Sequence, residues 1–185
     1  TKANTASDCN LVIPSDANWA GGPTTRRSTS GVLSEYLGAS VHFVSRTQSL
    51  VAQSSAESEL YAIGTAISEG LHIRSFLQEA GFVRNMAIEV QTDSSSAKSI
   101  AKQFGTSRKT RHIQLRYLFM QDLVRCGIVQ LIKIAGDSNP AGIFTKFVKL
   151  DVLRRHLQRV GLVINRDQNL FQVCTSWPRP TYHFM

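Results

Sequence analysis

Hydrophobic and polar positions alternate along the first half of the chain and then recur at helical spacing. Short β-prone runs lie at residues 11–16, 32–37 and 41–45, and turn residues separate them. From residue 54 to 81 the apolar residues follow a helical period, and Ser54 stands where a helix cap is expected. This half therefore predicts three antiparallel strands followed by one long helix.

The second half alternates between the two periods. It predicts a fourth strand, two helices, a fifth strand and a final helix, over residues 87–92, 94–104, 113–127, 128–135 and 139–161. The element order βββαβααβα predicts an α/β fold with a five-stranded mixed sheet, whose first three strands are antiparallel and whose faces carry helices.

The 185 residues suffice for one domain with a sizeable core. We expect an N-terminal extension at 1–10, a domain at 11–162 and an irregular C-terminal tail at 163–185. No apolar run is long enough for a membrane span, and the polar start has no signal-peptide pattern, so we expect an intracellular protein of unresolved compartment and no membrane partner. The chain begins with Thr1 rather than Met, so we expect a segment of a longer polyprotein or a processed product.

Positive charge is clustered. The net charge is +8 and the sequence pI is about 9.8. Residues 101–116 carry five basic side chains and no acid: Lys102, Arg108, Lys109, Arg111 and Arg116. Such a segment favours a nucleic-acid partner, although a merely solvated basic surface gives the same composition.

Three carboxylates stand at informative places. Asp16 follows the first strand, Asp93 follows the fourth, and Glu59 lies early in the long helix. If the two strands are neighbours, their ends bring the acids together. Clustered carboxylates need a cation, and hard oxygen ligands suit Mg²⁺ or Mn²⁺. Two such ions ~4 Å apart serve phosphodiester hydrolysis. Each acid alone is more typical of a turn, cap or helix-dipole role, so the prediction depends on the three occurring together in this element order.

The strings around these acids resemble the ribonuclease H domain of copia-type LTR retrotransposon polyproteins. The matching strings are SDANWAG at 15–21, RRSTSG at 26–31, SSAESELYA at 54–62, TDSSSA at 92–97, RKTRHI at 108–113 with RY at 116–117, and NPAGIFTK at 139–146. The resemblance runs from about residue 11 to 162. It implies the RNase H-like fold and Mg²⁺-dependent endonuclease cleavage of RNA in RNA–DNA hybrids, with Mn²⁺ as a second usable ion. By motif position, Asp16, Glu59 and Asp93 match the first three catalytic, metal-binding carboxylates.

The sequence departs from the family pattern at the fourth acid, where Gly142 stands. Four further positions depart from it: Phe43, Gln114, Leu118 and Phe147. Because glycine has no ligating atom, we expect weak binding of a second ion and impaired cleavage. Asp137 could substitute only if its loop folds back. The alternative is a catalytically inactive module that binds nucleic acid or serves as a structural subunit, with protein partners contacting residues 163–185.

Hybrids are recognised through shape, 2′-hydroxyls and phosphates, so basic side chains are the candidate contacts. The candidates are Arg26, Arg27, Lys102, Arg108, Lys109, Arg111 and His112, the last at a position where the family usually has histidine. A solvated surface remains the alternative for the arginine pair and for the basic run. A related integrase-type fold is a weaker alternative, because the interval from Glu59 to Asp93 is short.

Overall fold

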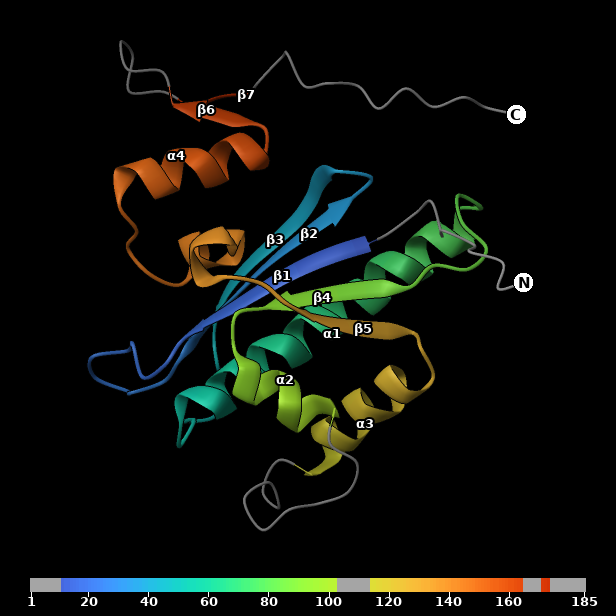
Figure 1. Cartoon of the computed structure of the whole chain (residues 1–185), viewed down its shortest axis with the longest axis horizontal. Coiled ribbons are helices and arrows are strands. Elements are labelled where there is room, and N and C mark those ends of the chain that lie inside the picture. Colours follow the sequence, from blue (N-terminus) through green and yellow to red (C-terminus); the bar gives the residue numbers. More distant parts are fainter. Residues whose placement is uncertain (1–10, 103–113, 165–170, 174–185) are drawn as a thin grey trace.

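A computed structural model describes residues 11–102, 114–164 and 171–173 (Figure 1). Its centre is a five-stranded sheet of order β3-β2-β1-β4-β5, in which β1, β2 and β3 are antiparallel while β4 and β5 run parallel to β1. The strands are β1 Leu11–Asn18, β2 Thr29–Tyr36, β3 Ala39–Thr47, β4 Ile88–Thr92 and β5 Val129–Lys133. The predicted mixed sheet is confirmed.

Four α-helices lie in the described residues: α1 Ser55–Glu79, α2 Ser95–Lys102, α3 Gln114–Arg125 and α4 Leu150–Arg159. The predicted cap of α1 is confirmed, since the Ser54 hydroxyl accepts a hydrogen bond from the Glu57 backbone amide at 3.2 Å. The Glu57 carboxylate in turn accepts a hydrogen bond from the backbone amide of Gln53 at 2.8 Å. This pairs a further backbone donor at the helix start.

Helix α1 packs across one face of the sheet, behind it in Figure 1. Gly70 makes this contact close, because a Cβ there would lie 2.5 Å from Ile13 Cδ1 and 2.9 Å from Ile88 Cγ2. Both isoleucines are fully buried in the main core. The close contact fixes the height of α1 above β1, which contains Asp16, and above β4, which Asp93 follows directly.

The predicted final helix over 139–161 is wrong as a single element. Its beginning forms a short 3-10 helix, η3 Pro140–Phe144, and α4 starts only at Leu150. Another short turn, η2 Gly136–Ser138, precedes η3. The break is explained by hydrogen bonds that hold η3 against strands β1 and β3 of the sheet.

The predicted irregular tail also needs correction. Strand β6, Leu162–Ile164, pairs antiparallel with β7, Phe171–Val173, in a separate two-stranded sheet next to α4. The remaining tail residues lie outside the described part, and the expected domain limits stay predictions. Within the described residues, no helix is both long and apolar enough to span a membrane.

Candidate functional site

Two of the three predicted acids come from neighbouring parallel strands. Strand β1 pairs with β4 in a register that sets Leu11 opposite Ile88 and Pro14 opposite Gln91, a constant offset of 77 residues. The same offset continued past the last pair sets Asp16 opposite Asp93, the residue that follows β4. The register of the parallel pair therefore brings these two carboxylates to one point at the sheet end.

Helix α1 supplies the third acid. Glu59 lies in the second turn, and its Oε1 accepts a hydrogen bond from the backbone amide of Ala17 at 3.3 Å. Its other oxygen, Oε2, is buried and has no hydrogen-bond partner among the described residues. One Glu59 oxygen is thus fixed beside Asp16, and the second remains available to a ligand.

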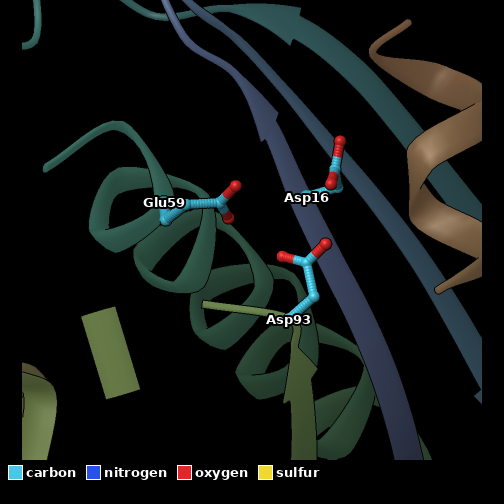
Figure 2. Close-up of side chains that lie close together, drawn as sticks. All are labelled: Asp16, Glu59 and Asp93. Carbon is cyan, nitrogen blue, oxygen red and sulfur yellow. The ribbon is translucent and has the colours of Figure 1, made fainter. Parts of the chain in front are cut away.

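Figure 2 shows the three carboxylates pointing toward one another from β1, α1 and the end of β4. Asp16, Glu59 and Asp93 each offer an oxygen within 4.8 Å of the others, and they are the one such group of potential metal ligands in the described residues. Asp137 is exposed and is not part of this group. A set of convergent hard oxygens with one unpaired acceptor fits a divalent cation such as Mg²⁺ or Mn²⁺.

The cluster is electrostatically costly in the absence of a cation. Burial, followed by the charges of Asp16 and Asp93, raises the pKa of Glu59 to about 8. Burial and the Asp16 charge likewise raise the pKa of Asp93. Clustered carboxylates therefore retain protons unless positive charge offsets their repulsion.

Segment 139–146, which contains Gly142 at the expected place of a fourth acid, is firmly attached to β1. Asn139 is 2% exposed, and its Nδ2 donates to the Ser15 carbonyl at 2.8 Å while its Oδ1 caps η3 by accepting from the Ala141 amide. Ser15 directly precedes Asp16 in β1. One buried amide side chain thus joins η3 to the strand that carries the first acid.

The same segment also contacts β2 and β3. Gly31, opposite Asp16 in the β1–β2 ladder, has no Cβ, and a Cβ there would lie 2.7 Å from the Ala141 carbonyl oxygen. Phe144 stacks on Phe43 with ring centroids 5.5 Å apart, and its carbonyl accepts from the Ser45 hydroxyl at 2.7 Å. These contacts hold η3 on the sheet and prevent one straight helix from running through to Arg159.

At the fourth position the structure has no ligand. Gly142 is buried in η3, and the side chains that reach Asp16 from this segment belong to Thr145 and Lys146. The Thr145 hydroxyl donates to Asp16 Oδ2, and Lys146 Nζ lies 3.2 Å from Asp16 Oδ1. Both residues lie in the NPAGIFTK string at 139–146, but the sequence pattern predicts no role for them. The available signal was the spacing of four between Gly142 and Lys146, which on a helical turn makes them neighbours.

The predicted nucleic-acid contacts are only partly placed. Arg26 and Arg27 are exposed in the loop between β1 and β2, and Lys102 is exposed in the last turn of α2. Neither arginine is among the groups acting on the pKa of Glu59 or Asp93, where the contributing cations are Lys146 and, for Asp93, Lys133. The other four candidates lie outside the described residues: Arg108, Lys109, Arg111 and His112.

Comparisons with known proteins give two kinds of likeness. The sequence is 31% identical over 159 residues to the retrovirus-related Pol polyprotein from transposon TNT 1-94 of Nicotiana tabacum, covering 86% of this chain and 12% of that polyprotein. It is 27% identical over 163 residues to the Pol polyprotein from transposon RE2 of Arabidopsis thaliana, covering 88% of this chain and 11% of that polyprotein. The chain thus spans about an eighth of the first and a ninth of the second. No protein-family model matches it.

Among solved structures, LC11-RNase H1 isolated from compost matches with a TM-score of 0.54 at 15% identity, covering 74% of this chain and 92% of that one. The RNase H domain of rv2228c from Mycobacterium tuberculosis matches at 0.53 and 10% identity, covering 81% of this chain and 97% of that one. LC11-RNase H1 in complex with an RNA/DNA hybrid matches at 0.51 and 13% identity, over 73% of this chain and 93% of that one. At such identities these structures establish a shared fold.

Proposed function

This chain has the ribonuclease H fold and is homologous to one segment of copia-type retrotransposon Pol polyproteins, and on that premise we propose that it is an impaired, metal-dependent endonuclease for RNA in RNA–DNA hybrids. The single observation that carries the proposal is the convergence of Asp16, Glu59 and Asp93, whose oxygens lie within 4.8 Å of one another. The hybrid as substrate is supported by the LC11-RNase H1 complex, which holds an RNA/DNA hybrid on the same fold.

Asp16, Glu59 and Asp93 are the residues that would hold the ion. A divalent ion bound by such carboxylates activates a water molecule and stabilises the leaving oxygen during phosphodiester hydrolysis. The protein contributes orientation: the Ala17 amide fixes one oxygen of Glu59, and the Thr145 hydroxyl fixes Oδ2 of Asp16.

Candidate contacts to the substrate backbone are Arg26, Arg27 and Lys102 in the described part, with the basic run at 108–112 as a further prediction.

Gly142 is the reason to expect impairment. Three carboxylates suffice to hold one ion, but a two-ion arrangement loses a ligand when the fourth position has no side chain. The segment around Gly142 nevertheless retains its docking contacts through Asn139 and Gly31. The expected defect is therefore a missing ligand on a preserved scaffold.

One observation favours a second function, a catalytically inactive RNase H-fold module that binds nucleic acid or acts as a structural subunit. The ammonium of Lys146 forms an ion pair with the Asp16 carboxylate, which a bound metal ion would need as a ligand. Such a module would bind hybrids through its basic side chains with an affinity that falls as salt rises. Protein partners of residues 163–185 belong to this alternative and remain a prediction.

A cleavage assay separates the two functions. A labelled RNA–DNA hybrid is incubated with the parent chain, Gly142→Asp and Gly142→Asn in Mg²⁺ and, separately, in Mn²⁺, with Asp16→Asn as the inactive reference. Asparagine matches aspartate in size but lacks its charge. Both side chains fit in the same way, because a Cβ at residue 142 meets only the flexible end of Lys146 at 3.3 Å.

We expect weak cleavage by the parent chain that Asp16→Asn abolishes, and faster cleavage by Gly142→Asp but not by Gly142→Asn. A silent parent with an active Gly142→Asp variant would point to a nuclease scaffold that now serves as a module. If all variants are silent with both ions, the nuclease proposal is rejected. Hybrid binding in the presence of EDTA then tests the alternative.

A further inference from the structure

We propose that Lys146 is a tethered cation that occupies the acid cluster of this chain and competes with divalent metal ions for Asp16. The inference rests on the proposed metal-binding role of the cluster and adds a control on it. A metal ion would gain full access to Asp16 only when the Lys146 ammonium moves away. Lys146 would therefore set the metal concentration at which the site fills.

The contact is between a buried carboxylate and a half-exposed ammonium. Lys146 Nζ lies 3.2 Å from Asp16 Oδ1, and the side chains are 49% and 1% exposed. The charge also reaches the other two acids, because Lys146 lowers the pKa of Glu59 and of Asp93 against the opposing effect of burial. A single ammonium thus offsets repulsion across all three carboxylates, as a bound cation would.

Neighbouring contacts hold Lys146 in reach of the cluster. The adjacent Thr145 hydroxyl donates to the other oxygen of Asp16. Asn139 and Gly31 dock the preceding turn on β1 and β2. Because the backbone is fixed at this point, only the flexible side chain of Lys146 has to find its position, which lowers the entropic cost of the contact.

Gly142 explains why this lysine is directed to Asp16. A Cβ at residue 142 would lie 3.3 Å from Lys146 Cε and 3.8 Å from its Nζ. An aspartate there would therefore offer a carboxylate to Lys146 at a spacing of four residues. Glycine offers no carboxylate. With glycine instead of aspartate at residue 142, the site therefore lacks a metal ligand, and Lys146 pairs with Asp16 instead.

Lys146 also lies at the edge of a cavity. It lines an open cavity of about 490 Å³, whose other charged lining residues are the acids Asp137 and Asp151 and the bases Lys149 and Arg155. Two acids and two bases thus face a displaced ammonium, so the cavity gives it solvated space but no net negative charge, and Asp16 stays its preferred partner until a metal ion binds.

The test measures Mn²⁺ binding by titration, with free ion followed by electron paramagnetic resonance, in the intact chain and in variants. Lys146→Met removes the charge and keeps an unbranched side chain only one atom shorter. Lys149→Met is the matched control, since it removes the same charge from the same cavity without a contact to Asp16. Asp16→Asn gives the background, and thermal unfolding checks that each variant is folded.

We expect Lys146→Met to bind Mn²⁺ about tenfold more tightly than the parent, and Lys149→Met to change the affinity by less than about threefold, because charge effects weaken with distance and solvent screening. A second readout is acetylation of lysines in the parent chain: Mn²⁺ should increase the labelling of Lys146 and leave that of Lys149 unchanged.

Unchanged or weaker binding by Lys146→Met would overturn the competition and leave the proposed nuclease function standing. Binding by Lys146→Met no stronger than by Asp16→Asn would overturn both, since the cluster would then not be a metal site. Equal gains in the two lysine variants would reduce the effect to net charge and would also overturn the proposal.

Discussion

The two sides of the acid cluster are both held in place by specific contacts, but they carry opposite charges. On one side, β1, β4 and α1 direct three carboxylates to one point. On the other, η3 is docked by Asn139, Gly31 and Phe144, yet this segment presents Gly142 and, two residues after η3 ends, Lys146. The first side attracts a cation, and the second supplies one from the chain itself.

The difference indicates that docking and ligation are separable properties of this fold. The contacts of η3 come from a buried amide, a missing Cβ and a ring stack, and none of them involves the side chain of residue 142. A change at that position can therefore alter the charge of the site and leave the scaffold in place.

The pH dependence of stability tests the carboxylate side. The pKa of Glu59 is raised to about 8 from an ordinary value of 4.5, so the folded state holds a proton that the unfolded state releases. Stability from this group is complete below about pH 4.5 and is lost as pH rises through about 8. Glu59→Gln carries no such charge. Its stability relative to the parent should therefore rise between these pH values and level off above them, by a few kcal/mol, since one pKa unit is about 1.4 kcal/mol.

The measurement is urea unfolding of both proteins at several pH values in the presence of EDTA. Glutamine can still accept the hydrogen bond from the Ala17 amide, so the comparison isolates the charge. A stability difference that does not vary with pH would mean that the three carboxylates do not interact as the structure indicates.

Asn139→Ala tests the docked side. The change removes a helix cap and leaves the buried Ser15 carbonyl without its donor, so the free energy of unfolding should fall by about 2 kcal/mol. Ser54→Ala, which removes only the cap of α1, is the control and should cost about 1 kcal/mol. Amide hydrogen exchange should increase in residues 139–146 and stay unchanged in β1 and β4. Faster exchange throughout the sheet would contradict the separation of the two sides.

Phe43→Ser should have the smallest effect. Phe43 is 66% exposed, and its stack on Phe144 contributes about 0.5–1 kcal/mol to the docking of η3. Phe82→Ser, at a phenylalanine that is 71% exposed and distant from η3 in the chain, should change stability by less than about 0.5 kcal/mol. Chemical denaturation distinguishes the two, and equal losses would show that the ring stack does not contribute.

Local patterns were sufficient for much of the fold. The alternation at 87–92 located β4 within one residue of its start, and the cap at Ser54 located the beginning of α1. The final helix was predicted incorrectly because the apolar spacing at 139–161 is helical throughout, whereas the hydrogen bonds that interrupt it come from β1 and β3. Periodicity reports the preference of a segment, and tertiary contacts can override it.

Strand ends and motif spacing are local properties of the chain, so they sufficed to predict the mixed sheet and to single out Asp16, Glu59 and Asp93. The partners of Asp16 on the η3 side depended on tertiary packing. Thr145 and Lys146 lie 129 and 130 positions from Asp16, and no local pattern specifies a pair so far apart. Their contact arises because η3 packs on the face of the sheet where Asp16 is buried, which brings the lysine charge next to the carboxylate.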